Sequence, residues 1–155
     1  MSLAMVQHAI ETCKRHLDKT GARNSEIEAY LTRYLLVLIV AVYEEEFERL
    51  IAERAEKTND KPLAAFVRSA THKLLRSMKL SELKGYLGRF SATHADEFSR
   101  NSAERSRLAF DVIVQSRNEV AHSGGTNVVM TLDDLDQHLT ESKNILRAFE
   151  LSIAS

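Results

Sequence analysis

The sequence contains few of the residues that break helices or cross-link chains. Its 155 residues include one cysteine, one proline and five glycines. A single cysteine excludes an internal disulfide framework and the thiolate cluster of a structural zinc site, and it fits a reducing compartment best. Because proline and glycine are so rare, long stretches of the chain are free to form helices. The sequence therefore favours an all-helical protein.

An excess of positive charge and a long apolar run are also missing. Lys and Arg total 21 against 22 Asp and Glu, so any contact with RNA must be local. The longest apolar run, Leu35 to Tyr43, is far shorter than the roughly 18 residues that a membrane span requires. The first residues lack the basic flank and apolar core of a signal peptide. We therefore expect a cytoplasmic protein without a membrane contact.

The remaining composition is that of an ordinary globular protein. Hydrophobic residues make up 44% and charged residues 28%, and the chain is long enough to bury a sizeable core. Internal repeats, low-complexity segments and clear linkers are missing, so we expect a single domain over residues 1–155. Strand patterns are nearly absent. We predict an all-α compact bundle of about five to six helices around one long central helix.

The first two helices are predicted from apolar periodicity. One covers Leu3 to Lys19 and ends at Gly21, and a much longer one runs from about Ser25 to Asn59. Ser25 and Glu28 have the spacing of a capping box. Within the long helix, Leu35 to Tyr43 is apolar all round, which predicts that other helices wrap it, with the tyrosines of this helix among the packed side chains (Tyr30, Tyr34, Tyr43).

The middle of the chain is less clearly marked. A third helix is predicted with Pro62 in its first turn and an end near Ser77. Ser81 is the expected cap of a short fourth helix that ends near Phe90. The polar stretch Ser91 to Asn101 is the best candidate for a mobile loop, although it has room for one helical turn.

The last two helices are better defined. One runs from Ser102 to His122 before Gly124-Gly125 ends it, and the other opens at Thr131 with Asp134 in the capping-box position. Arg117 falls on the apolar stripe of the first of these helices, where periodicity assigns a core residue. A guanidinium at such a position must reach solvent, pair with an acid, or face a second subunit or an anionic ligand.

Three polar side chains gather at the end of this helix. Asn118 and His122 are four residues apart and share a face, while Arg117 lies about 140° round from His122 but has the length to reach the same phosphate. The negative end of the helix dipole favours the imidazolium, so we expect a raised pKa for His122. Taken alone, a snorkelling arginine and a helix-terminal histidine are the more ordinary interpretation.

The segment Arg117-Asn118-Glu119-Val120-Ala121-His122, followed by Ser123-Gly124, resembles the R-N-x-x-x-H signature of HEPN domains. The stretch from Tyr30 to Glu44 is similar to the second helix of the RiboL-PSP-HEPN subgroup, so the resemblance covers roughly Ser25 to Phe149. It implies a helical bundle, frequent two-fold dimers and, in many members, metal-independent cleavage of RNA. Other members of the superfamily are catalytically silent binding modules.

The resemblance also implies roles for individual residues. Arg117 would stabilise charge on the phosphorane, His122 would move a proton to or from the ribose 2′-hydroxyl or the leaving oxygen, and Asn118 would orient the phosphate or His122. Glu44, with two further glutamates beside it, would support the site by orienting Arg117 or His122. This chemistry needs no cofactor and no metal, and the histidines and Cys13 show no metal-ligand spacing.

The implied partners are RNA and a second copy of the chain. We expect the two helices from Ser102 to His122 to approach across a two-fold axis, with two Arg117 and two His122 side chains around one cleft. The family further implies a toxin or defence effector with an antitoxin or nucleotidyltransferase partner. Two other functions stay open: a non-catalytic HEPN module that binds RNA, nucleotide or a partner protein, and a purely structural helical dimer.

Overall fold

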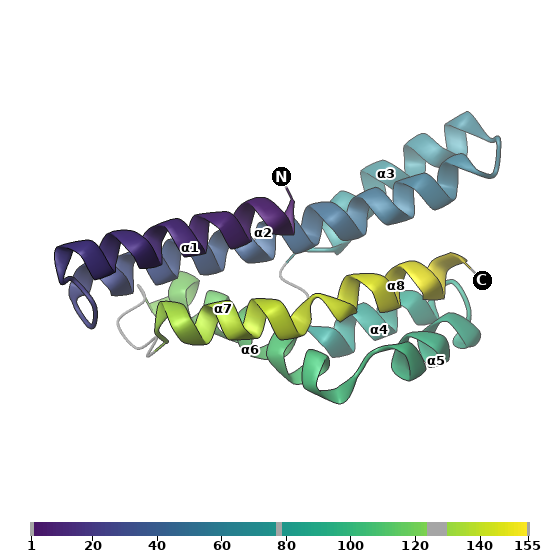
Figure 1. The fold of residues 1–155 in the computed structure, drawn as a ribbon. Coiled ribbons are helices and arrows are strands. Elements are labelled where there is room, and N and C mark those ends of the chain that lie inside the picture. Colours follow the sequence, from purple (N-terminus) through teal and green to yellow (C-terminus); the bar gives the residue numbers. More distant parts are fainter. Residues whose placement is uncertain (1, 77–78, 124–129, 155) are drawn as a thin grey trace.

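The chain folds into an elongated bundle of helices (Figure 1). The computed structural model describes residues 2–76, 79–123 and 130–154, apart from the side chains of residues 122 and 123. Within these ranges no strand occurs, and the helices are α1 (Leu3–Thr20), α2 (Glu26–Glu56), α3 (Lys61–Leu74), α4 (Leu80–Gly88), α5 (Ala92–Asn101), α6 (Glu104–Ser123), α7 (Leu132–Ser142) and α8 (Asn144–Ala154). The predicted all-α bundle around one long helix is confirmed, with more helical segments than expected.

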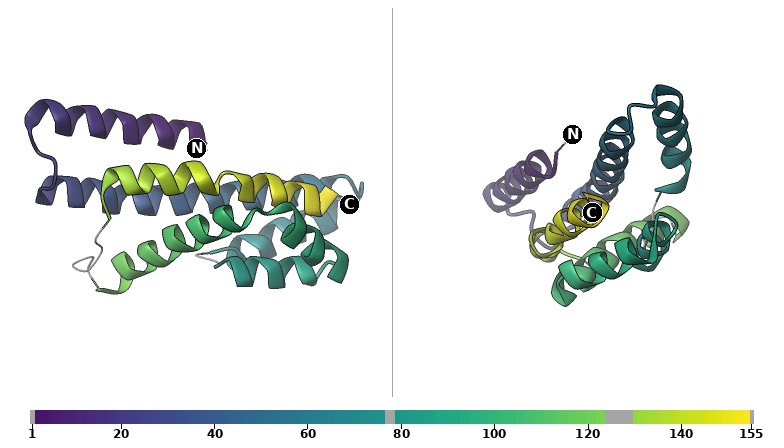
Figure 2. Two further views of the ribbon diagram at one scale, coloured as in Figure 1. Left: turned by 60° about the horizontal axis from the view of Figure 1, so that its bottom comes forward. Right: turned by 90° about the vertical axis from the view of Figure 1, so that its right-hand side faces the viewer.

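The long helix α2 organises the other helices. Its 31 residues run through the length of the molecule, with α1 and α7 along its N-terminal part and α3 folded back along its C-terminal part (Figures 1 and 2). α1 stops where predicted, at Gly21, whose φ of 64° is the left-handed conformation that commonly ends a helix.

One side of α2 forms the centre of the core. The Tyr43 ring packs edge-on against Phe110 of α6 with 5.1 Å between centroids, and its hydroxyl lies 2.7 Å from the Ser142 hydroxyl of α7. Phe47, one turn further on, lies 4.8 Å from Phe149 of α8. These contacts join α2 to three other helices, and burial raises the pKa of Tyr43.

The other side of α2 is not covered, so the prediction of a fully wrapped helix is wrong. Four large side chains on one face are exposed by 55%, 68%, 68% and 43% of their area: Ile27, Tyr30, Tyr34 and Val37. We call these four residues the α2 stripe. Of the three tyrosines expected to pack, only Tyr43 is buried, and Tyr30 and Tyr34 lie on the exposed face.

The stretch predicted as a mobile loop is helix α5, so that prediction is also wrong. Ser91 caps it by accepting a hydrogen bond from the His94 N–H at 3.3 Å. Phe98 is fully buried, with its ring 6.4 Å from that of Phe149. A single aromatic anchor in a polar segment therefore stabilises this helix through packing on α8, which local composition does not reveal.

The neighbouring helix boundaries need smaller corrections. α4 is preceded by Lys79 instead of Ser81, because Glu82 accepts the Lys79 N–H at 2.8 Å and Asp111 of α6 accepts the Leu80 N–H at 2.9 Å. The predicted capping box at Thr131 is confirmed. The final helix is divided at Lys143 into α7 and α8. The expected glycine stop after α6 lies outside the described residues.

The capping box predicted for Ser25 and Glu28 does not form. The Ser25 hydroxyl instead donates to the Ala22 carbonyl at 2.6 Å. Glu28 is buried, and its two oxygens accept the N–H of Asn24 at 2.7 Å and the N–H of Leu132 at 3.2 Å. One carboxylate thus satisfies donors at the starts of both α2 and α7, where helix dipoles favour negative charge.

Replacing Glu28 by glutamine is expected to lower the free energy of unfolding by about 1–3 kcal/mol, because an amide group would leave a buried N–H without an acceptor. Urea denaturation of the full chain measures this loss. Glu26→Gln is the matched control, since Glu26 is exposed in the same helical turn. Equal stability of the two variants would contradict the bridging role of Glu28.

Candidate functional site

The predicted motif lies at the C-terminal end of α6. Arg105 near the start of α6 pairs with Glu141 near the end of α7, so these two helices run antiparallel. Phe110, Ile113 and Val114 of α6 are buried in the core. Arg117 continues their line and is half-buried, as the apolar periodicity predicted.

Arg117 has little to neutralise it in the part of the chain that the structure describes. Its Nη1 donates to the Asn118 side-chain oxygen at 3.3 Å, a contact between neighbours in sequence. Among the described side chains, none of the ion pairs involves Arg117. A guanidinium has five N–H donors, so most of them stay available for an anion.

His122 lies in the last turn of α6, and its side chain falls outside the described residues. The structure therefore places the backbone of all three motif residues on one helix end and brings together the side chains of Arg117 and Asn118. The convergence of three side chains on one phosphate stays a prediction, as does the raised pKa of His122.

Glu44 is half-buried on α2. α7 runs parallel to α2, because Glu28 bonds Leu132 and Tyr43 bonds Ser142, so α6 runs antiparallel to α2. Since Tyr43 contacts Phe110, Arg117 lies at a level of α2 that is about 10 Å from Glu44 along the helix axis. This register argues against direct contact, and the supporting role of Glu44 stays a prediction.

Arg33 was not singled out from the sequence, and it is a cation on the part of α2 that lies level with the motif. Arg33 is half-buried, and its Nε is fully buried without a hydrogen-bond partner among the described residues. Its guanidinium carbon lies 5.5 Å from the centre of the Tyr30 ring. By the register above, Arg33 lies near the level of the last turns of α6. No local pattern marks it, because one arginine in an apolar helix is usually a snorkelling residue.

A comparison with protein-family models matches residues 6–155 to the RiboL-PSP-HEPN model. The chain belongs to the RiboL-PSP-HEPN family. Neither a curated protein nor a solved structure matches it. The family match extends beyond both ends of the segment from Ser25 to Phe149 on which the resemblance rested, so α1 and the end of α8 are part of the HEPN domain as well.

Two arginines that precede the HEPN motif serve the fold. Arg105 bonds Glu141, and this bond, followed by one from Gln137, lowers the pKa of Glu141 to about 2. Arg107 donates from Nη1 to the backbone carbonyls of Ser99 at 3.1 Å and Ser102 at 2.9 Å, at the end of α5. Both guanidinium groups thus bond acceptors within the same domain.

The described part of this HEPN domain contains no cluster of potential metal ligands. Within it, no group of three or more His, Cys, Asp or Glu side chains has a geometry that would hold a metal ion. The described helices also include none that combines the length and the apolar character needed to cross a membrane.

Proposed function

We propose that this HEPN domain is a metal-independent endoribonuclease, with Arg117, Asn118 and His122 as its reactive groups. The observation that carries the proposal is the state of Arg117. Its half-buried side chain continues the inward stripe of α6, and its one described polar contact is Asn118. An arginine that is half-buried without a described acid beside it suits a phosphate that binds bidentately.

The chemistry follows from these side chains. His122 acts as the base that takes the proton of a ribose 2′-hydroxyl, and the 2′-oxygen then attacks the adjacent phosphorus. The bond from phosphorus to the 5′-oxygen breaks, and that oxygen takes up a proton. Arg117 stabilises the charge that develops on the non-bridging oxygens, while Asn118 holds the phosphate or His122 in position. The products carry a cyclic phosphate and a 5′-hydroxyl.

Incubation of the purified wild-type protein with mixed cellular RNA and a chelator tests this proposal. Cleavage should persist in chelator, and the new 3′ ends should first carry a cyclic phosphate, because the histidine and arginine need no metal. Chelator-sensitive cutting contradicts the mechanism. Binding of RNA without cutting would favour a non-catalytic HEPN module instead. The role as toxin or defence effector, with an antitoxin or nucleotidyltransferase partner, is proposed from the family alone.

The active form in this proposal is a homodimer with two motifs around one cleft. The α2 stripe supports it, because four large apolar side chains at coiled-coil spacing suit a second helix. By the helix register, the stripe lies at the end of the molecule that carries the motif. A second copy seated there would bring its own Arg117 and His122 to the same end.

Tyr34→Asp is expected to convert the dimer to a monomer, because it sets a charge in an apolar contact that should bury upwards of about 1,000 Å². Light scattering at micromolar concentration measures the mass. Phe66→Asp on α3 is the matched control, since Phe66 is 69% exposed and Tyr34 68%. A wild-type monomer would exclude the composite site, and a dimeric Tyr34→Asp variant would exclude the α2 stripe as its interface.

A further inference from the structure

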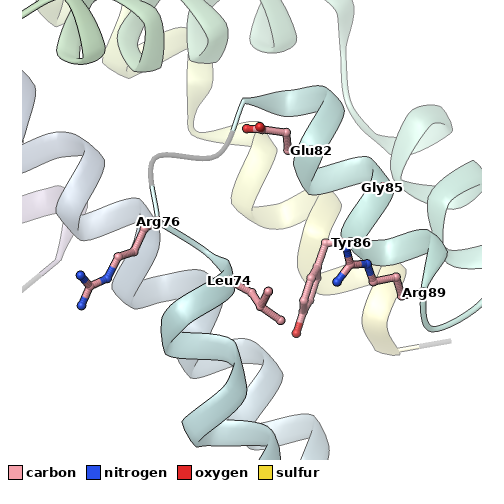
Figure 3. A pocket seen from close by; sticks show the side chains of 6 residues that line it. All are labelled: Leu74, Arg76, Glu82, Gly85, Tyr86 and Arg89. Atoms are coloured by element: carbon pink, nitrogen blue, oxygen red, sulfur yellow. The ribbon is translucent and has the colours of Figure 1, made fainter. Parts of the chain in front are cut away.

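A cavity of about 390 Å³ opens between the end of α3 and one face of α4. Leu74 of α3 and Tyr86 of α4 point toward each other across it, and Arg89 lies beside Tyr86 (Figure 3). Arg76 and Glu82 stand at its rim. The side chains thus provide a slot with an apolar and an aromatic wall and with two arginines and one glutamate at its edge, at a size typical of small-molecule sites.

Hydrogen bonds fix some of the side chains that line this cavity, and the arginines among them keep N–H donors for a ligand. The Tyr86 hydroxyl lies 3.3 Å from the Thr71 hydroxyl, which fixes the ring. Arg76 is held by His72 at 3.0 Å and points toward α2 (Figure 3), which leaves other N–H donors of its guanidinium unused. Arg89 is exposed and makes no ion pair with any side chain that the structure describes.

Gly85 forms part of the cavity wall within α4. A glycine inside a helix is less favourable than alanine by about 1 kcal/mol. A Cβ added here would meet no atom within 4 Å, so packing within the described chain does not demand a glycine. What the glycine provides is room in the cavity, which suits a flat group that enters it.

We propose that this cavity binds one nucleotide of the RNA substrate, with the base between Leu74 and Tyr86 and a phosphate at Arg89. Aromatic walls with adjacent arginines are the usual means of holding single-stranded RNA, since every base has a face that can stack. This inference rests on the proposed function, because both sites then contact one RNA strand.

Two observations favour a nucleotide in a strand over a free mononucleotide. Tyr86 begins a row of rings, with Phe90 at 5.5 Å and His94 a further 6.1 Å away, and Phe90 is 47% exposed. In addition, the Leu80 N–H bond to Asp111 ties the start of α4 to α6. From this bond α4 runs away from the C-terminal end of α6 (Figure 1), so Tyr86 and Arg117 are about 20 Å apart along the helices, a distance that a short single strand spans.

The test uses the full chain and two pocket variants, Arg89→Gln and Gly85→Leu, the second of which fills the cavity. Each should raise the KM for a short single-stranded RNA roughly tenfold and leave kcat unchanged at saturation. Lys84→Gln is the matched control, because Lys84 is exposed on α4 and does not line the cavity. Circular dichroism would check that each variant keeps its helices.

A direct measurement separates this inference from the nuclease proposal. Titration with a nucleoside monophosphate should shift the NMR signal of the Gly85 amide in the wild type but not in Arg89→Gln, and a short RNA strand should do so at lower concentration. If wild type cuts RNA and both pocket variants keep its KM, the pocket inference is overturned while the nuclease stands. If wild type does not cut, yet the Gly85 signal moves as described, the nuclease proposal fails and the pocket stands.

Discussion

Alanine at Arg117 or at His122 is expected to reduce RNA cleavage by about 10²-fold or more, with helix content and mass unchanged. Loss of Arg117 removes the fixed charge that stabilises the transition state, and loss of His122 removes the proton carrier. Arg117 is a half-buried polar residue near the end of α6, and the backbone of His122 lies in the last turn of the same helix. Cleavage of a labelled RNA in chelator, at equal protein concentration, measures the effect.

Two further variants make the result specific. Gln115→Ala is the matched control, because Gln115 is exposed on the same helix and its side chain bonds only Glu119 among the described residues. Arg117→Lys keeps the charge but loses the paired donors, so its activity should fall between wild type and Arg117→Ala. If Arg117→Ala cuts at the wild-type rate, the site has been assigned to the wrong residues. If it loses RNA binding and wild type never cuts, the protein is a binding module.

Leu36→Ala is expected to lower the free energy of unfolding by about 2–5 kcal/mol, the largest effect on stability that we predict. Leu36 is completely buried in the side of α2 that faces the bundle, so the substitution leaves a cavity. Leu108→Ala removes the same atoms from a side chain that is 63% exposed and should cost far less. Urea denaturation measures both. Similar losses would show that α2 packs through another face.

Periodicity predicted most of this fold because helices bury one face. The apolar stripe of α6 that leads to Arg117 follows from spacing, although Ala121, one turn further on, is exposed, and the capping box at Thr131 follows from spacing as well. Periodicity failed where long-range contacts decide. Phe98 stabilises α5 from within a polar segment, and Glu28 caps across to α7 instead of back to Ser25.

The apolar run of α2 was a different kind of error. A helix that is apolar all round is expected to be wrapped, yet Leu38 is only half-buried and Val37 is exposed. Composition predicts how much apolar surface a helix has to bury, but it does not predict which neighbouring helix or subunit covers that surface. For the site, the motif predicted the residues on α6, whereas Arg33 depends on how two helices are placed and has no local signal.

The exposed α2 stripe has a consequence for how the thermal stability of the protein depends on dimerisation. If two copies join along the α2 stripe, α2 becomes the interior of the pair, and part of the core forms only on association. Unfolding is then coupled to dissociation of the dimer, so the midpoint of thermal unfolding should rise with protein concentration. In Tyr34→Asp the midpoint should be lower and independent of concentration, since every molecule unfolds alone.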